Sequence, residues 1–178
     1  DEEIKETSLG LGAMVPFIRP KELALDTTPT LPVLKHALLE MERQGKYFDA
    51  VCILQSTSPF RPPGFIDECI EKFTQTEADT LISVKKVPDH FNPHWVFEND
   101  DNGFARIATG ENQVIPRRQL LPDTFYRDGM VYIVKRELFE SGNTLYGEKV
   151  VCLESIGGNI NIDNMDDWEK AEKYISKK

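Results

Sequence analysis

The order of hydrophobic and polar residues along the chain predicts an alternation of helices and strands. Apolar residues at helical spacing, with glycines and capping residues at the ends, predict helices over 2–11, 30–44, 65–73, 136–140 and 166–175, with Thr30 as an N-cap. Short apolar runs predict strands over 13–18, 50–54, 80–84, 129–134 and 149–153. The run 50–54 is continuous, as expected for a strand covered on both faces. This alternation predicts an α/β domain with right-handed crossovers between parallel strands.

The segment 88–128 interrupts that pattern. It is rich in proline, asparagine, aspartate and aromatic residues, and it contains two of the three histidines. We interpret it as an excursion from the sheet that could form short antiparallel strands, and not as a linker.

Length and composition narrow the class of protein. The 178 residues suffice for one domain with a core, and 40% hydrophobic with 29% charged residues is an ordinary globular composition. The first residues lack the basic and apolar regions of a signal peptide, and no apolar run reaches the roughly 20 residues of a membrane helix. We therefore expect a cytoplasmic protein that has no membrane partner.

Charge and cysteine content exclude further classes. A net charge of −9, spread along the chain, argues against a nucleic-acid partner, whose phosphates require a basic surface. The three cysteines lie far apart without a CxxC pair, which disfavours zinc sites and disulfides and favours buried thiols. GxGxxG and Walker A motifs are absent, and His36 is expected to face solvent, with no nucleophilic partner.

The polar loop 55–61 follows the buried run 50–54. A buried parallel strand that ends in a polar loop delivers that loop to the ligand-binding edge of an open α/β sheet. Gln55 offers a donor and an acceptor, three hydroxyl residues follow, and the Arg61 fork suits a phosphate or carboxylate. The alternative is a turn whose hydroxyls bind only the local backbone.

Two sets of arginines are candidates for anion binding. Arg117, Arg118 and Arg127 lie close together in an acidic chain, which favours a local anion site over surface ion pairs only in combination with other motifs. Arg19 follows a predicted strand and could contact a phosphate or lie in a surface loop.

A third candidate is the segment 159–164. Strand alternation would place Asn159, Asn161 and Asp163 on one face, where their oxygens suit Mg²⁺. The alternative is that Asp163 or Asn164 caps the following helix.

Taken in order, these segments resemble the acylneuraminate cytidylyltransferases, or CMP-sialic acid synthetases. The matching motifs are Arg19-Pro20-x-Glu22-Leu23-Ala24-x-Asp26-Thr27, Leu54-Gln55-x-Thr57-Ser58-Pro59-x-Arg61, Arg117-Arg118-Gln119, Arg127-x-Gly129 with Tyr132, and Ile160-x-Ile162-Asp163. They cover nearly the whole chain in the family order, and the second motif is the most specific.

The resemblance implies a Rossmann-like three-layer nucleotidyltransferase fold with a mostly parallel sheet. It implies a single domain over 1–178, a dimerisation arm at 88–128 and hence a homodimer. It also implies that Asp1 aligns just past the family's second strand, so that the first strand, the Gly- and Lys-containing phosphate loop and the first helix are missing from this chain.

The activity that the resemblance implies is Mg²⁺-dependent attack by the anomeric hydroxyl of a nonulosonic acid on the α-phosphate of CTP, with release of pyrophosphate. Positioning and charge neutralisation dominate such reactions. The resemblance assigns nucleotide contacts to Arg19 and Thr30. It assigns sugar contacts to Gln55, Arg118 and Tyr132, with Arg118 on the carboxylate, and metal binding to Asn161 and Asp163. Asp163 would also help to deprotonate the attacking hydroxyl.

The chain also departs from the family pattern near the site. Asn161 replaces an aspartate, while Tyr126 and Asp128 replace an arginine and an asparagine. These changes are expected to weaken the metal site and to make the pocket more acidic. They leave two alternatives open: the same chemistry on another sugar acid or nucleotide, or a non-catalytic, truncated or degenerate homologue that acts as a binding or structural module.

Overall fold

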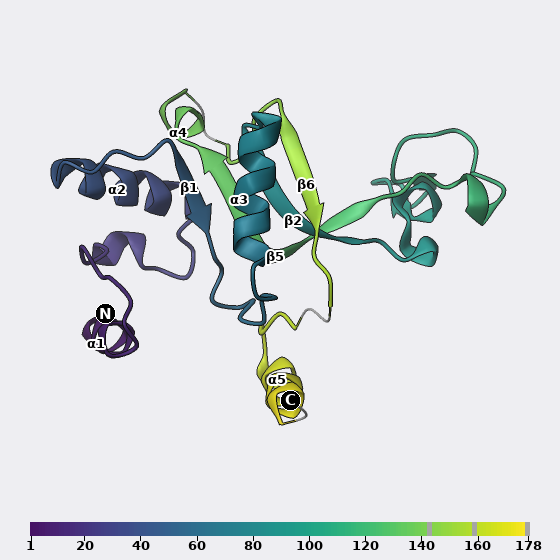
Figure 1. Ribbon diagram of the computed structural model, residues 1–178. Helices are drawn as coiled ribbons and strands as arrows, with labels where there is room; N and C mark the ends of the chain where they lie inside the picture. Colours follow the sequence, from purple (N-terminus) through teal and green to yellow (C-terminus); the bar gives the residue numbers. More distant parts are fainter. Residues whose placement is uncertain (142–143, 158–159, 177–178) are drawn as a thin grey trace.

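The computed structural model describes residues 1–141, 144–157 and 160–176. A four-stranded sheet forms its centre, in the order β1-β5-β2-β6 (Figure 1). The strands are β1 (Ala50–Ile53), β2 (Thr80–Lys86), β5 (Phe125–Lys135) and β6 (Val150–Glu154). Strand β5 pairs antiparallel with both β1 and β2, whereas β2 and β6 pair in parallel.

The sheet is therefore mixed, and the expected mostly parallel arrangement is not confirmed. Strands β1 and β2 do run in the same direction, as their strand–helix–strand order predicts, but β5 lies between them. The physical reason is that β5 is long and apolar. Its residues 130–134 are almost completely buried, so it takes a central position that pairing between β1 and β2 would leave to no strand.

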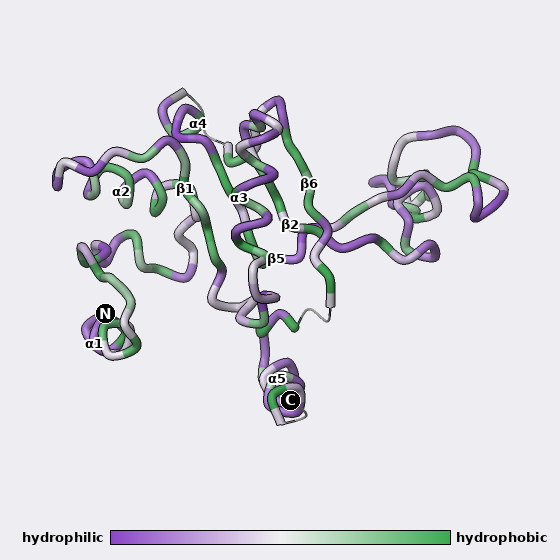
Figure 2. The backbone as a smooth tube through the Cα atoms, in the orientation of Figure 1, coloured by the Kyte–Doolittle hydropathy of each residue, from purple (hydrophilic) through white to green (hydrophobic). Residues whose placement is uncertain are grey.

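Helices cover both faces of the sheet. Helix α3 (Phe65–Thr76) packs on one face, where Phe65 and Cys69 join Leu81, Val131 and Ile133 in a buried cluster. On the other face, α2 (Thr30–Arg43) and α4 (Glu137–Ser141) bury Leu38, Val134 and Phe139 together. Figure 2 shows the hydrophobic residues concentrated along the four central strands, as this layered packing requires.

Two further helices lie away from the sheet (Figure 1). Helix α1 (Glu2–Gly10) is capped by Asp1, whose side chain accepts a hydrogen bond from the Ile4 N–H. Helix α5 (Met165–Ile175) is capped by Asn164 in the same way, which confirms one of the alternatives for that residue. A 3-10 turn, Lys21–Leu23, lies between α1 and α2.

The segment that follows β2 extends away from the sheet as an arm, here defined as residues 88–124 (Figure 1). It contains the antiparallel pair β3 (Phe97–Asn99) and β4 (Ala105–Ile107), as expected. Three 3-10 turns accompany them, Asp89–Phe91, Pro93–Trp95 and Arg118–Leu120. The Trp95 indole N–H donates to the Ile115 carbonyl at 2.8 Å and joins the two ends of the arm.

Several local expectations were wrong. Residues 13–18 form no strand, because Pro16 removes a donor, and the Pro16 carbonyl instead accepts from Gln44 of the turn after α2. His36 is half-buried, with its ring edge against Phe17 at 5.4 Å, and does not face solvent. Thr30 is the first residue of α2 and not its cap, since Pro29 occupies the cap position.

Exposure also corrects the sequence picture. Cys69 is fully buried, but Cys52 and Cys152 are exposed, because the outer faces of β1 and β6 are only partly covered. In α5, Ala171 is buried as expected, whereas Trp168 and Ile175 are exposed. In the described part of the chain, no helix combines the length and the apolar character needed to cross a membrane.

Candidate functional site

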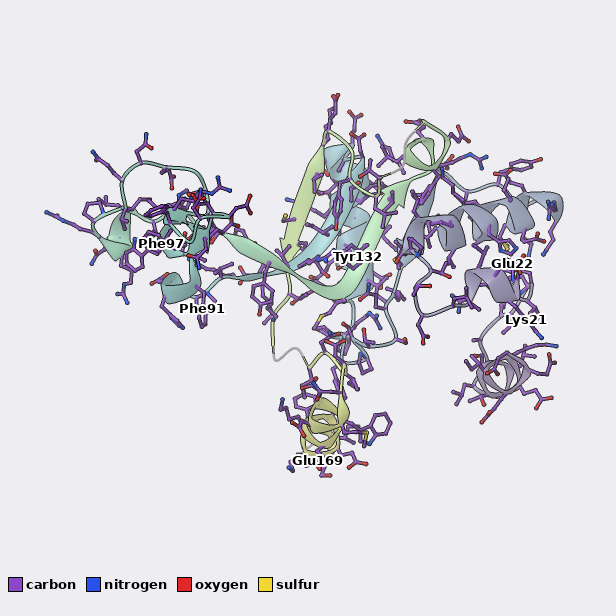
Figure 3. The ribbon with its side chains drawn as sticks, turned by 180° about the vertical axis from the view of Figure 1, so that it is seen from behind. Lys21, Glu22, Phe91, Phe97, Tyr132 and Glu169 are labelled. Atoms are coloured by element: carbon purple, nitrogen blue, oxygen red, sulfur yellow. The ribbon has the colours of Figure 1, made fainter. Side chains whose placement is uncertain are left out.

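A polar cavity of about 490 Å³ opens where β1 ends and β5 begins. Because these strands are antiparallel neighbours, with Ile53 opposite Tyr132, the exit of one and the entry of the other meet at the same sheet edge. The described lining residues come from four segments, namely Thr30, Gln55, Tyr126, Arg127, Asp128, Gly129, Tyr132 and Asn161. In Figure 3, Tyr132 lies near the middle of the molecule, between α2 and the arm.

A larger hollow, of about 730 Å³, lies between β1 and α3. Its walls are mainly hydrophobic, including Phe48, Ile70 and Phe73, and they lack the convergent polar groups of a reactive site. The smaller, polar cavity is therefore the better candidate.

The loop after β1 is braced from inside by Arg61. Its guanidinium donates to the carbonyl oxygens of Gln55, at 2.6 Å, and Met130, at 2.7 Å. Burial lowers the pKa of Arg61, while two charge-assisted bonds compensate for its partial desolvation. The fork that the sequence offered for a phosphate or carboxylate thus binds the protein's own backbone and holds Gln55 at the cavity.

Ser58 connects this loop to the segment before α5. Its hydroxyl is fully buried and donates to the Asn161 side-chain oxygen at 3.0 Å. The Ile162 N–H donates to the Thr57 carbonyl at 2.8 Å, which fixes the two backbones against each other. Asn161 is therefore positioned by the Gln55 loop, although residues 160–162 form no strand and Asn159 lies outside the described residues.

Gly129 permits the close approach of these groups. Its φ of +80° is a left-handed conformation, and a Cβ there would lie 2.8 Å from the Ser58 hydroxyl and 3.2 Å from the Gln55 side-chain oxygen. The position lies in an irregular part of β5, where the register against β2 shifts between Ile82 and Val84.

Asp128 stabilises this irregularity from below. Its carboxylate accepts hydrogen bonds at 2.5 Å from both Ser83 and Ser155, and at 3.0 Å from the Met130 N–H. The residue is only 5% exposed. The expectation that Asp128 makes the pocket more acidic is therefore wrong in its physical basis, because its carboxylate is turned into the sheet and is satisfied there.

Tyr132 and Arg127 form the opposite wall. Burial raises the pKa of the Tyr132 phenol, although the positive charge of Arg127 opposes this rise, so Tyr132 is a neutral donor near pH 7. Arg127 donates to the Tyr146 hydroxyl at 3.3 Å, and this contact raises the Arg127 pKa further. Tyr146 was not identified from the sequence, because it lies in an irregular turn before β6 where no periodic pattern points to the cavity.

Asp163 lies beside the cavity and is exposed. The Asn161 amide nitrogen donates to its carboxylate at 2.5 Å, so Asn161 orients Asp163 and directs its own oxygen toward Ser58. Across the described ranges, no group of three or more His, Cys, Asp or Glu side chains could hold a metal alone. One carboxylate is nevertheless compatible with Mg²⁺, which commonly takes one or two carboxylates and completes its shell with substrate phosphates and water.

Two predicted site residues do not line the cavity. Arg118 lies on the arm, where its guanidinium pairs with Asp89 at 3.4 Å and remains 68% exposed. Arg19 is exposed in the segment between α1 and α2. The structure thus brings together Thr30, Gln55, Tyr132 and Asn161, with Asp163 adjacent, and the roles of all these residues stay predictions.

Comparisons with known proteins extend this picture, although no family model matches the chain. The chain is 29% identical over 185 residues to CMP-N,N'-diacetyllegionaminic acid synthase of Legionella pneumophila, covering 98% of this chain and 74% of that protein. It is 28% identical over 175 residues to N-acylneuraminate cytidylyltransferase A of Danio rerio, covering 98% of this chain and 39% of that protein.

A solved structure shares the fold. The 4-diphosphocytidyl-2C-methyl-D-erythritol synthase of Anaerococcus prevotii superposes with a TM-score of 0.57 at 15% identity, covering 84% of this chain and 68% of that one. The sequence similarity extends over nearly the whole chain, and the most specific motif, Gln55–Arg61, forms one wall of the polar cavity. The chain therefore belongs to the acylneuraminate cytidylyltransferase family of enzymes.

Proposed function

We propose that this chain activates a sialic-acid-like, nonulosonic sugar by transferring CMP to it from CTP. The anomeric hydroxyl of the sugar attacks the α-phosphate, a new P–O bond forms, and the bond to pyrophosphate breaks. The observation that carries the proposal is the convergence of Gln55, Tyr132 and Asn161 on one polar cavity, in a chain whose similarity to such enzymes spans nearly its full length.

Within this proposal, Gln55 and Tyr132 bind the sugar. Gln55 offers both a donor and an acceptor to hydroxyl groups, and Tyr132 offers a neutral phenol. Thr30, at the start of α2, and Arg19 contact the nucleotide. Support for Thr30 comes from its place in the cavity wall, whereas Arg19 rests on the motif alone.

Asp163 is proposed as the residue that receives the proton of the attacking hydroxyl and as the carboxylate that holds Mg²⁺. Its exposure leaves it accessible to substrate, and the Asn161 amide fixes its orientation. Bound Mg²⁺ would supply neutralisation of the charge on the phosphates. Positioning of the two substrates by the cavity then accounts for most of the remaining rate enhancement.

We also propose that the arm mediates homodimerisation and that the protein works in the cytoplasm. Support for the dimer comes from large hydrophobic side chains on the arm that are more than half exposed, namely Phe91, Phe97, Phe104 and Leu120. Support for a reducing compartment comes from the three cysteines, which are all free thiols.

The test is a pyrophosphate-release assay on the protein expressed from its complete gene. Release is expected only when CTP, Mg²⁺ and a nonulosonic acid are present together. Asp163→Ala should lower kcat by about 100-fold or more, the usual contribution of a positioned acid–base group.

The matched control is Asp166→Ala, which removes an exposed carboxylate three residues further along, in the first turn of α5. It should retain wild-type turnover. No release across a panel of nonulosonic acids and nucleotides would refute the proposed reaction, and an Asp163→Ala enzyme with wild-type kcat would remove Asp163 from the mechanism.

A further inference from the structure

We infer that Arg127, oriented by Tyr146, binds the carboxylate of the acidic sugar and thereby selects sugar acids over neutral sugars. This inference rests on the proposed function, since it names the group that recognises one of the two substrates. It transfers to Arg127 a role that the sequence motifs assign to Arg118.

The charge of the cavity wall is the first step of the argument. Among the lining residues that the structure describes, Arg127 is the cation and Asp128 the anion. The Asp128 carboxylate is occupied by Ser83 and Ser155 inside the sheet. A ligand in the cavity therefore faces a local field dominated by one positive charge.

One guanidinium matches a single carboxylate. Its fork geometry accepts both carboxylate oxygens at once, which gives directional recognition as well as charge. A triphosphate carries several negative charges, and proteins commonly bind it with a metal ion, backbone N–H groups and more than one cation. The single cation of this wall thus favours the sugar acid over the nucleotide as the partner of Arg127.

The hydrogen bonding of Arg127 leaves it available. Its side chain donates to the Tyr146 hydroxyl at 3.3 Å, which is long for an N–H···O bond. Such a contact orients the guanidinium while other N–H donors stay directed at the cavity. The phenol of Tyr132 lies in the same wall and remains protonated, so it can add a neutral donor to the same anion.

Arg118 is differently placed. It lies on the arm, outside the described cavity wall, and its guanidinium already pairs with Asp89. For Arg118 to reach a sugar in this cavity, the arm would have to move or a second chain would have to supply it. Arg127 needs neither, because it is held on β5 two residues before Gly129.

The experiment compares a nonulosonic acid with its methyl ester, which has the same shape but no negative charge. Binding of each to the complete protein is measured by calorimetry, and KM for the sugar acid and for CTP is measured by pyrophosphate release. Wild type should bind the acid about 10- to 100-fold more tightly than the ester, the range for hydrogen bonds to a charged group.

Arg127→Gln should remove this preference, raise KM for the sugar acid by a similar factor and leave KM for CTP within about twofold. Arg127→Lys keeps the charge but loses the fork, and should restore part of the preference. Tyr146→Phe should weaken the preference less than Arg127→Gln does. Arg106→Gln, which removes an exposed cation on the arm, is the control and should behave as wild type.

Three results would overturn the inference. One is an acid-over-ester preference that survives Arg127→Gln in a variant with the wild-type melting temperature. Another is a rise in KM for CTP in place of the sugar acid, which would assign Arg127 to the phosphates. The third is loss of the preference in Arg118→Gln but not in Arg127→Gln.

Failure of the proposed reaction stays distinguishable from failure of the inference. Calorimetry reports binding of the acid even when no pyrophosphate is released. Acid binding that Arg127→Gln abolishes, in a protein without turnover, would support the carboxylate contact while refuting the reaction. Turnover that is indifferent to Arg127 would do the reverse.

Discussion

At the scale of single residues, Gly129 shows how tightly the cavity is constrained. Its backbone takes a left-handed conformation beside Ser58 and Gln55, two residues that come from a loop more than 70 positions earlier in the chain. A side chain at 129 would meet both the strain of its own φ and the crowding of that loop. The glycine of the motif is thus explained by packing and not by flexibility.

We predict that Gly129→Ala destabilises the protein by about 2–4 kcal/mol and raises KM for the sugar. About 1–2 kcal/mol comes from the positive φ. The remainder comes from the Cβ that would lie 2.8 Å from the Ser58 hydroxyl, which forces the loop carrying Gln55 to move. Urea unfolding and steady-state kinetics measure the two effects.

Gly110→Ala is the matched control for this prediction. Gly110 has a φ of +81°, but a Cβ there would meet nothing within 4 Å. It should therefore show the backbone strain alone, with unchanged KM. Equal losses of stability in the two variants would contradict the proposed crowding at Gly129.

At the scale of elements, Asp128 is the point at which three strands are joined. It lies on β5, accepts from Ser83 on β2, and accepts from Ser155 at the end of β6. Ser83 also accepts a hydrogen bond from the Val131 N–H at 2.8 Å, and so replaces a ladder bond where the register shifts. One buried carboxylate thus stabilises the irregular stretch from which Gly129 and Tyr132 reach the cavity.

We predict that Asp128→Ala lowers the free energy of unfolding by about 3 kcal/mol or more. The substitution leaves two buried hydroxyls and one N–H without their acceptor, and each such group costs about 1–3 kcal/mol. Asp128→Asn keeps one acceptor oxygen at nearly the same size and should cost less. Urea denaturation of both variants provides the measurement.

Asp101→Ala serves as the reference, because Asp101 is an exposed carboxylate in the turn between β3 and β4. Its unfolding midpoint should match wild type. If Asp128→Ala were as stable as Asp101→Ala, the serine hydroxyls would have found other partners and the three-strand junction would not depend on Asp128.

At the scale of the whole molecule, the arm is the feature that a single chain does not explain. It projects from the sheet and exposes aromatic side chains, and Phe91 and Phe97 both lie on it in Figure 3. Exposed apolar groups that gather on one projecting segment are typical of interfaces. The proposed homodimer would bury them.

We predict that Phe97→Asp converts a dimer into monomers. Phe97 is 53% exposed on β3, and a charge buried there in a protein interface would be desolvated without a partner. Light scattering coupled to size-exclusion chromatography measures the mass directly. The control is Leu11→Asp, at a position that is 83% exposed outside the arm. A wild-type monomer, or a Phe97→Asp dimer, would contradict the role of the arm.

Local pattern by itself determined most of the secondary structure. Helix α2 begins at the predicted residue and ends one residue early, and the apolar runs at 50–54 and 80–84 became β1 and β2. These predictions succeed because periodicity and capping act over a few residues and need no distant partner. The ordered motifs likewise identified the family, since Gln55, Tyr132 and Asn161 are recognisable by type and order.

Only the tertiary structure decided which segments meet. Strand β5 lies between β1 and β2 although it follows both in sequence, Arg61 binds backbone rather than substrate, and Asp128 turns away from the cavity. The run 13–18 has strand composition but no strand, because a strand exists only through its pairing. Such outcomes depend on contacts between residues tens of positions apart, and no local pattern encodes which of two arginines reaches the cavity wall.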